Sequence, residues 1–265
     1  MNPDYSAGMS AGRDAAARAR AWRHAVHATV CDVLEPWDHG TVVRATRYPS
    51  YFEFNVVRVE EDPQMSVDAL VAFADEALAG LDHRRVDIEP AGVAESMRAA
   101  FEARGWSTYR QVWMRHEAPP PPQPTRIAVE EVPFDAVNAL RVAWTSEDFP
   151  DLELGNYLAE AREVAGILGA QIVAVMDAST PVAYAQVVRL SRSAEIAQVY
   201  VRRDHRGRGL GTALTCAAIE AVRDADELWI VADDEGWPKQ LYSRLGFSPA
   251  WTAVEMLRLP DRSAT

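Results

Sequence analysis

The chain has 265 residues, a formal net charge of −12 and 48% hydrophobic residues. This length suits one large or two ordinary domains with packed cores, and the acidic balance argues against nucleic acid as a partner. No stretch has the ~18 uninterrupted apolar residues of a membrane span. Residues 1–20 also lack the apolar centre of a signal peptide, so we expect a cytoplasmic protein that does not bind membranes.

The first part of the chain is predicted to alternate helices and strands. We expect a helix over 12–34, strands over 41–47 and 51–59, a helix over 67–81, a strand over 85–89, a helix over 93–104 and a strand over 107–115. His24 and His27 lie three residues apart on the first helix, but the pattern offers no third ligand, so no metal site is expected. Cys31 and Cys216 lie in helical patterns, which favours buried free thiols over a disulfide.

A proline-rich segment over 117–125 predicts an extended linker between a domain over 1–116 and a domain over 126–265. The second domain is predicted to have this order: a strand over 126–132, helices over 134–147 and 156–168, strands over 171–177 and 182–191, a strand ending at 201, a helix over 212–222, a strand over 227–233, a helix from 237, and closing strands over 247–259. Pro238 suits the first turn of its helix, and Gly246 suits a left-handed cap at its end.

An arginine- and glycine-rich turn over 206–211, RGRGLG, joins the strand ending at 201 to the next helix. The first turn of a helix leaves its N–H groups unpaired and partly positive, and glycines let a ligand approach the backbone closely. Arginines surround this turn in an otherwise acidic chain: Arg202, Arg203, Arg206 and Arg208. The pattern therefore predicts an anion site.

The spacing of the glycines excludes two kinds of nucleotide site. A Walker loop needs a lysine after its last glycine, and none is present. The dinucleotide fingerprint G-x-G-x-x-G fails because Gly207, Gly209 and Gly211 follow the pattern G-x-G-x-G. The pattern that fits is [Q/R]-x-x-G-x-[G/A], met by Arg206, Gly209 and Gly211.

A second motif, LY-x-x-LGF over 241–247, follows downstream. With these two motifs and this element order, residues 126–260 resemble the GNAT superfamily of N-acetyltransferases. The resemblance implies an α/β fold whose central, mostly antiparallel sheet is flanked by helices. It also implies acetyl-CoA as co-substrate, no metal, and direct attack of a primary amine on the acetyl group in a ternary complex.

The resemblance implies cofactor-binding residues as well. Val199 and Val201 offer backbone groups to the pantetheine arm, and the pyrophosphate is held by the turn and the start of the helix. These residues are Arg206, Gly207, Arg208, Gly209, Leu210, Gly211 and Thr212. Where the family often has an asparagine that contacts the cofactor, this chain has the run 233–236, DDEG, so that contact is not implied.

Two catalytic residues are implied. Tyr242 corresponds to a tyrosine that donates a proton to the departing thiolate, and its ordinary pKa near ~10 keeps it protonated at neutral pH. Glu195, in the triplet Ala-Glu-Ile, corresponds to a general base, with a solvent-facing strand carboxylate as the alternative interpretation. Acidic side chains between the first two helices of this domain are alternative acceptor contacts: Glu147, Asp148 and Asp151.

The two halves of the chain end alike. Residues 84–115 and 227–258 each run strand, helix and closing strand, with Phe101-x-x-x-Gly105-Trp106 in the first and the LY-x-x-LGF segment in the second. This repeat predicts two GNAT-like modules in tandem. The first module has Glu60-Glu61-Asp62-Pro63 in place of the glycine turn, and its carboxylates would repel a pyrophosphate. We therefore expect a degenerate N-terminal module and one cofactor site per chain.

Other functions remain open on the sequence alone. One is a non-catalytic acetyl-CoA-binding or sensor protein whose acceptor cleft is blocked by the N-terminal half. Another is transfer of a larger acyl group, or transfer to an oxygen or a thiol. The acceptor is expected to be a small-molecule or peptide amine, with the acidic balance favouring a cationic one, and a homodimer is left open.

Overall fold

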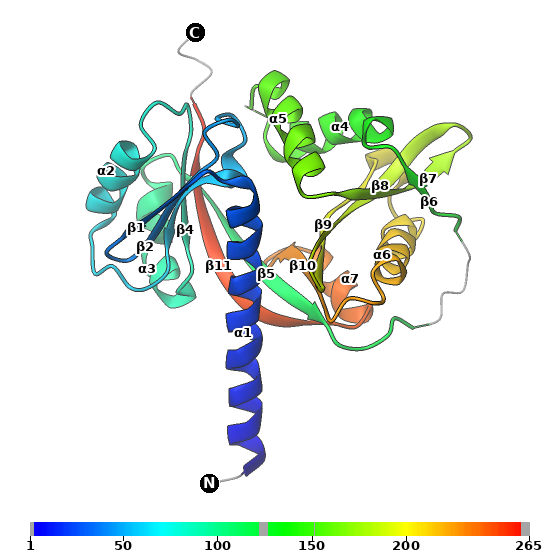
Figure 1. Cartoon of the computed structure of the whole chain (residues 1–265), viewed down its shortest axis with the longest axis horizontal. Helices are drawn as coiled ribbons and strands as arrows, with labels where there is room; N and C mark the ends of the chain where they lie inside the picture. Colours follow the sequence, from blue (N-terminus) through cyan, green and yellow to red (C-terminus); the bar gives the residue numbers. More distant parts are fainter. Residues whose placement is uncertain (1–2, 122–126, 151, 261–265) are drawn as a thin grey trace. The chain divides into compact units, whose positions relative to one another are not determined.

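The computed structural model describes residues 3–121, 127–150 and 152–260, with backbone alone for 3–13. Its elements are drawn in Figure 1. The helices are α1 (Pro3–Val30), α2 (Val67–Ala77), α3 (Ala91–Glu102), α4 (Asn138–Asp148), α5 (Leu154–Ile167), α6 (Leu210–Ala221) and α7 (Pro238–Arg244). The strands are β1 (Val33–Trp37), β2 (Gly40–Arg44), β3 (Asn55–Val59), β4 (Arg84–Ile88), β5 (Ser107–His116), β6 (Glu130–Val132), β7 (Gln171–Asp177), β8 (Thr180–Leu190), β9 (Ser193–Val201), β10 (Glu227–Asp233) and β11 (Phe247–Arg258).

The chain divides into two compact units that interleave in sequence. Unit 1 consists of Met1–Val26, Val112–Trp144 and Ala165–Trp251, and unit 2 consists of His27–Gln111, Thr145–Val164 and Thr252–Thr265. These units are defined by packing, whereas the expected domains over 1–116 and 126–265 are defined by the proline-rich linker between them. The domain division therefore stays a prediction, and residues 122–125 of the expected linker lie outside the described residues.

Unit 1 is built on a mixed sheet with the strand order β5-β10-β9-β8-β7-β6. Strands β6 to β9 pair antiparallel in succession, and β9 pairs parallel with β10. Helices α6 and α7 cover one face of this sheet, where their apolar side chains form a core with those of β8, β9 and β10. The start of α4 packs on the other face, against β7 and β8. The expected α/β fold with a mixed sheet between helices is confirmed.

Unit 2 repeats part of this plan, with the strand order β1-β2-β3-β4-β11. Strand β3 pairs antiparallel with β2 and parallel with β4. Helices α2 and α3 contribute Leu70 and Phe101 to the core over β4. The hydroxyl of Ser66 caps α2 by accepting the Ala69 N–H at 3.2 Å, which accounts for where this helix begins.

The strands that end the two halves of the sequence are exchanged, so that each one pairs in the sheet of the other half. Strand β11 ends the second half, but it pairs antiparallel with β4 of unit 2, from Val254 opposite Ile88 to Arg258 opposite Arg84. Strand β5 ends the first half, but it lies next to β10 in unit 1. This exchange explains why the two units interleave in the sequence.

Several predicted boundaries are wrong. The first helix begins at Pro3 and ends at Val30, and the residues that follow form the unexpected strand β1. The middle of β1 is exposed and contains Glu35 and Pro36, so it lacks the apolar alternation of a half-buried strand. The predicted strand over 51–59 begins only at Asn55, because Phe52–Phe54 forms a 3-10 turn. The closing segment is one strand rather than several.

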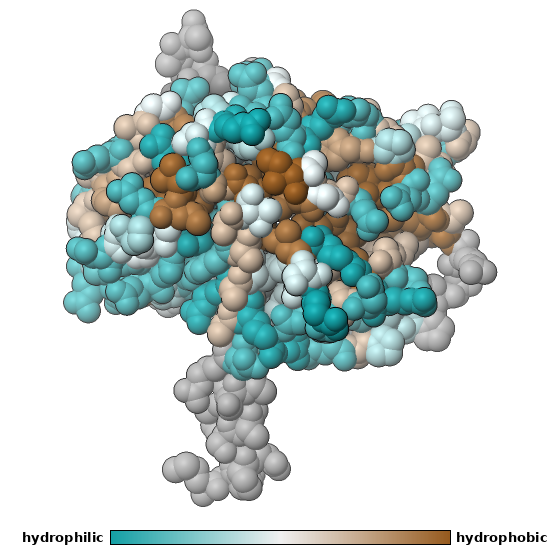
Figure 2. All heavy atoms as spheres, viewed as in Figure 1, coloured by the Kyte–Doolittle hydropathy of each residue, from teal (hydrophilic) through white to brown (hydrophobic). Residues whose placement is uncertain are grey.

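Figure 2 shows hydrophilic residues over most of the face drawn, with hydrophobic side chains visible between them. Four large hydrophobic side chains are exposed among the described residues: Leu34, Val142, Ile167 and Trp237. None of the helices in the described ranges is long and apolar enough to cross a membrane.

Two equivalent glycines of the repeat provide a test of the fold. Gly105 and Gly246 both have left-handed backbone, with φ of 77° and 92°. A Cβ on Gly105 would meet nothing within 4 Å, whereas one on Gly246 would lie 1.8 Å from the carbonyl oxygen of Ala118. Gly105→Ala should therefore lower the free energy of unfolding by about 1 kcal/mol, the cost of left-handed backbone alone.

Gly246→Ala should lower the free energy of unfolding by roughly 3–4 kcal/mol, because the clash adds to the backbone strain. Urea denaturation of both variants measures the difference. Equal losses in the two variants would contradict the close approach at Gly246.

Candidate active site

The central feature of unit 1 is a parallel ladder that stops in mid-strand. Strands β9 and β10 pair from Ser193 and Glu227 only as far as Ile196 and Ile230, although they continue to Val201 and Asp233. The ladder between β8 and β9 contains a bulge at the same level, because Gln186 pairs with Gln198 and Val187 with Ile196. A bulge bends and twists its strand. The β10-facing edge of residues 197–201, which includes Val199 and Val201, therefore has no ladder partner in β10.

The equivalent parallel pair of unit 2 stays closed. Val59, the last residue of β3, pairs with Ile88, and the Glu89 N–H then donates to the Val59 carbonyl at 2.9 Å. In the loop that follows β3, the N–H groups of Glu60 and Glu61 are already hydrogen-bonded, because both donate to the His39 carbonyl, at 2.8 and 3.4 Å. The expectation that the N-terminal module holds no cofactor stays a prediction.

The glycine turn after β9 has the geometry of an anion site. Gly207 and Gly209 have left-handed backbone with φ of 76° and 80°, and Gly209 caps the start of α6. The first intrahelical bond runs from the Ala213 N–H to the Gly209 carbonyl at 3.1 Å. The N–H groups of residues 207–212 have no backbone acceptor in the described part of the chain. Such a row of N–H groups without backbone acceptors at a helix N-terminus attracts an anion.

The arginines of this turn have different roles. Arg202 forms an ion pair with Asp204 at 2.7 Å, and the bonds from Arg202 and then His205 hold the pKa of Asp204 well below its usual range. Arg206 donates from Nε to the Val201 carbonyl at 3.0 Å, which ties the turn to the end of β9. Arg208 donates to the Asp204 carbonyl at 3.1 Å. This contact engages a neutral oxygen and leaves the positive charge of Arg208 at the turn.

Tyr242 lies on the α6/α7 side of the sheet. Its side chain is 6% exposed and its ring contacts Phe247, with 6.2 Å between centroids. Its hydroxyl has no hydrogen-bond partner among the described residues, yet it is not one of the fully buried unpaired atoms, so it keeps access to solvent. Burial raises the pKa of Tyr242 above its ordinary value. The phenol therefore keeps its proton at neutral pH and has an open position for an acceptor.

Glu195 lies on the opposite face. Its neighbours Ala194 and Ile196 pack into the core under α6 and α7, so strand alternation directs Glu195 away from that core. Its carboxylate is half-buried, and the indole Nε1 of Trp22 donates to its Oε2. Its Oε1 has no hydrogen-bond partner within the described ranges but is not fully buried. Glu195 is thus partly enclosed and hydrogen-bonded, and its role as general base stays a prediction.

The pKa of Glu195 reflects three influences. Burial is the largest and raises the pKa, while the bond from Trp22 and the charge of Arg23 lower it. The sequence analysis missed both of these α1 residues. A tryptophan and an arginine in a helix carry no local signal for a distant partner, and Trp22 lies 173 positions from Glu195.

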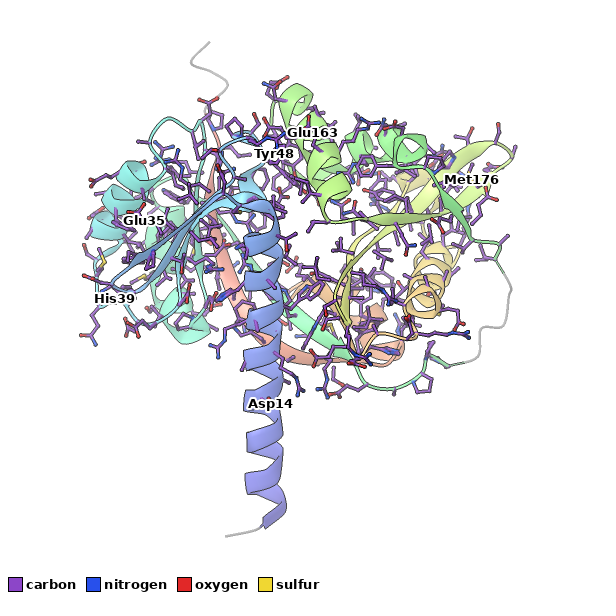
Figure 3. All side chains as sticks on the ribbon, viewed as in Figure 1. Asp14, Glu35, His39, Tyr48, Glu163 and Met176 are labelled. Carbon is purple, nitrogen blue, oxygen red and sulfur yellow. The ribbon has the colours of Figure 1, made fainter. Side chains whose placement is uncertain are left out.

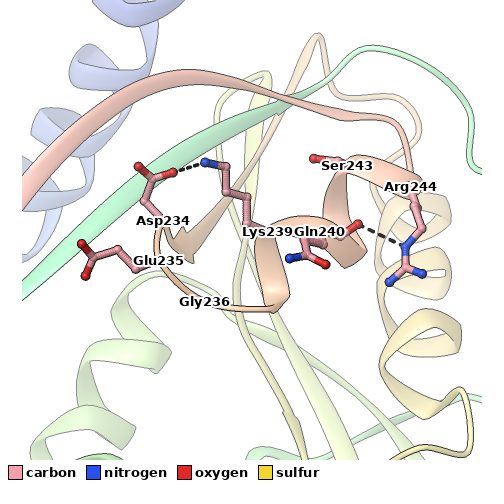
Figure 4. Close-up of a pocket in the computed structure, with 7 residues that line it drawn as sticks. All are labelled: Asp234, Glu235, Gly236, Lys239, Gln240, Ser243 and Arg244. Atoms are coloured by element: carbon pink, nitrogen blue, oxygen red, sulfur yellow. Dashed lines mark hydrogen bonds and ion pairs between the residues drawn. The ribbon is translucent and has the colours of Figure 1, made fainter.

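The run Asp233–Gly236, which replaces the expected asparagine, forms the loop from β10 to α7. The Glu235 N–H donates to Asp233 Oδ1 at 2.9 Å, and Lys239 pairs with Asp234. A pocket of about 540 Å³ opens here, lined by Asp234, Glu235, Gly236, Lys239, Gln240, Ser243 and Arg244 (Figure 4). Because β9 and β10 are parallel, this loop and the glycine turn lie at the same end of the sheet.

Other expected site residues are less informative. Glu147 and Asp148 end α4 within unit 2 and Asp151 lies outside the described residues, so their role as acceptor contacts stays a prediction. Cys31 and Cys216 are free thiols, half-buried rather than fully buried. Among the described residues, no group of three or more His, Cys, Asp or Glu side chains could hold a metal ion. The expectation of a metal-independent site stays a prediction.

Comparison with known proteins finds similarity over the segment that contains this site. Residues 169–249 match the family model of the acetyltransferase (GNAT) domain. An uncharacterized N-acetyltransferase of Methanocaldococcus jannaschii is 38% identical over 73 residues, which cover 26% of this chain and 32% of that protein. The match thus spans about a third of the length of that relative.

Solved structures share the fold. A functionally unknown conserved protein from Staphylococcus epidermidis superposes with a TM-score of 0.64 at 11% identity, over 87% of this chain and 95% of that chain. A tandem GNAT protein from the clavulanic acid biosynthesis pathway superposes with a TM-score of 0.50 at 17% identity, over 77% of this chain and 75% of that chain. These two structures share the fold alone, whereas the matched segment supports an acyltransferase. The match of residues 169–249 to an acetyltransferase (GNAT) domain agrees with the two motifs of the sequence.

The buried phenol of Tyr242 gives a titration that can be measured without a substrate. Burial disfavours the phenolate, so the folded-state pKa lies above the unfolded value of ~10. The unfolded chain then releases this proton first, and folding stability should fall as pH rises above ~10. Absorbance at 295 nm, compared between wild type and Tyr242→Phe, should show one phenol that ionises later than a free tyrosine. A difference spectrum that titrates near ~10 would contradict the burial of this hydroxyl.

Proposed function

We propose that this protein is an acetyl-CoA-dependent N-acetyltransferase. It transfers an acetyl group to a primary amine of a small molecule or peptide by direct attack in a ternary complex. The observation that carries the proposal is the parted ladder between β9 and β10, with an anion-binding turn at its end. Glu195 and Tyr242 lie on opposite faces of the same sheet.

The cofactor would be held mainly by backbone groups. The N–H groups of residues 207–212 would bind the pyrophosphate, and the positive charges of Arg206 and Arg208 would add to the attraction. The β10-facing edge of β9 at Val199 and Val201 would hydrogen-bond the pantetheine arm as a missing strand would. The parted ladder supports this role, since it leaves this edge without a ladder partner in β10, although the Val201 carbonyl already accepts from Arg206.

The transfer needs one proton acceptor and one proton donor. The amine must be neutral to attack the thioester carbonyl, and Glu195 would take its proton at Oε1, directly or through one water. The C–N bond forms, the C–S bond breaks, and Tyr242 would protonate the departing thiolate. No acyl-enzyme is required, because holding donor and acceptor together can supply ~7–11 kcal/mol of the barrier.

One observation favours a second candidate, a non-catalytic acetyl-CoA sensor. Trp22 covers one oxygen of Glu195, so α1 restricts this carboxylate. If no amine can reach Oε1, the domain would bind the cofactor without using it. Binding together with thiol release separates the enzyme from the sensor.

The anion-binding turn can be tested by charge reversal at the two ends of one helix. Arg208 precedes α6 and Arg223 follows it, and both side chains are exposed. Arg208→Glu should weaken acetyl-CoA binding at least about tenfold, because it places a negative charge beside the pyrophosphate. Arg223→Glu should leave the affinity unchanged. Isothermal titration calorimetry measures both, and equal affinities in all three proteins would exclude this turn as the pyrophosphate site.

The chemistry can be tested by release of free thiol from acetyl-CoA over a panel of amines. For an amine that reacts, Tyr242→Phe should lower kcat about 10²–10⁴-fold, the usual contribution of a general acid, with little change in acetyl-CoA affinity. Unchanged turnover would remove Tyr242 from the mechanism. Thermal stabilisation by acetyl-CoA without thiol release on any amine would favour the sensor instead.

A further inference from the structure

Helix α1 is fixed against the sheet of unit 1 at the point where β9 and β10 begin. Ala15, Ala19 and Trp22 recur at helical spacing and are all buried. Arg18 bridges Asp14, labelled in Figure 3, and Glu227, with nitrogen–oxygen distances of 2.5 and 2.7 Å. Glu227 opens β10 and pairs in register with Ser193, the first residue of β9. The helix is therefore held at the closed end of the parted ladder.

Trp22 and Trp229 are both neighbours of Glu195, but only Trp22 donates a hydrogen bond to its carboxylate. Trp22 is 5% exposed and its Nε1 donates to Oε2 of Glu195. Trp229 lies directly opposite Glu195 in the β9–β10 ladder and is fully buried. Its indole N–H has no acceptor among the described residues. The two indoles thus provide a matched pair for separating the hydrogen bond from the packing of an aromatic ring.

The positive charge near Glu195 is held in place as well. Arg23 is buried, with its guanidinium 5.0 Å from the ring centroid of Trp113 and 6.0 Å from that of Trp251. The two rings pack on each other with 4.4 Å between centroids. Stacking on aromatic faces favours a fixed guanidinium. Arg23 therefore stays where its charge favours the ionised form of Glu195.

Among the described residues, Arg23 is the one charged group that shifts the pKa of Glu195. Its register partner on β8 is Val188, and its partner on β10 is Trp229. The charge state of this carboxylate is consequently governed by burial and by α1.

We propose that Trp22 is a positioning residue for Glu195. Its indole N–H fixes Oε2, leaves Oε1 to accept a proton, and together with Arg23 keeps the half-buried carboxylate ionised at neutral pH. The role of Glu195 as base rests on the proposed function, whereas the control of its ionisation by Trp22 does not. The working site then includes α1, which lies outside the matched family segment 169–249.

The direct test is a pH titration of Glu195 by NMR with carboxyl-¹³C glutamate, in which Glu195→Gln assigns the signal. Trp22→Phe removes the bond and keeps an aromatic ring. It should raise the pKa of Glu195 by about one unit or more, the size of one hydrogen bond to a charged group. Trp229→Phe removes an indole N–H that has no acceptor and should leave that pKa unchanged. An unchanged or lowered pKa in Trp22→Phe would overturn the proposal, as would an equal rise in both variants.

A measurement on the wild type decides the matter if Trp22→Phe does not fold. The indole N–H signal of Trp22 should shift with pH at the pKa of Glu195, and absence of that shift would overturn the proposal. The acid limb of kcat/KM for acetyl transfer should also move to higher pH in Trp22→Phe. If no amine is acetylated, the proposed function fails while the NMR titration still decides the role of Trp22.

Discussion

The rest of the site depends on the ladder between β9 and β10 ending after Ile196 and Ile230. Backbone donors and acceptors inside a sheet need partners, and an open edge between two strands gives up the bonds that a closed ladder would form. The bulge at Ala197 supplies the local cause, since it turns the second half of β9 away from the line of the first. The equivalent pair β3 and β4 has no such parting and pairs to the last residue of β3. The parting of the two strands is therefore specific to β9 and β10 of unit 1 and is not shared by the equivalent strands of unit 2.

Once the strands part, the surrounding residues acquire their positions from simple geometry. Loops that follow two parallel strands lie at the same edge of a sheet, so the glycine turn and the Asp233–Gly236 loop share one end. Side chains alternate along β9, so Glu195 faces away from the helices that carry Tyr242. Burial raises the pKa of both groups. The raised pKa keeps the Tyr242 hydroxyl protonated, so it can donate a proton. For Glu195, burial opposes the ionised form that a general base requires. Two residues of α1, Trp22 and Arg23, lower the pKa of Glu195 and so counteract this effect of burial.

The parts of this arrangement that sequence could predict are those encoded locally. Three features specify the backbone within a few residues: the glycine spacing at 207–211, the proline at the start of α7 and the left-handed Gly246. The missed features depend on partners far away in sequence. Strand β1 carries an exposed, proline-containing run, and the bond from Trp22 joins residues 173 positions apart. The pairing of β11 with β4 could not be predicted from the sequence either. The alternation of apolar and polar residues specifies which face of a strand is buried, but not which strand lies beside it.

The exchange of closing strands gives the degenerate half a physical role that needs no ligand. Strand β5 lies beside β10, and its residues 112–116 belong to unit 1 together with residues 3–26 of α1. Without β5, the β5-facing edge of β10 would be unpaired in addition to the β9-facing edge beyond Ile230, and an open strand edge is a site for aggregation. Without α1, the Glu195 carboxylate would lose its only hydrogen-bond donor among the described residues. The half that lacks the glycine turn thus completes the sheet and supports the candidate base of the half that has it.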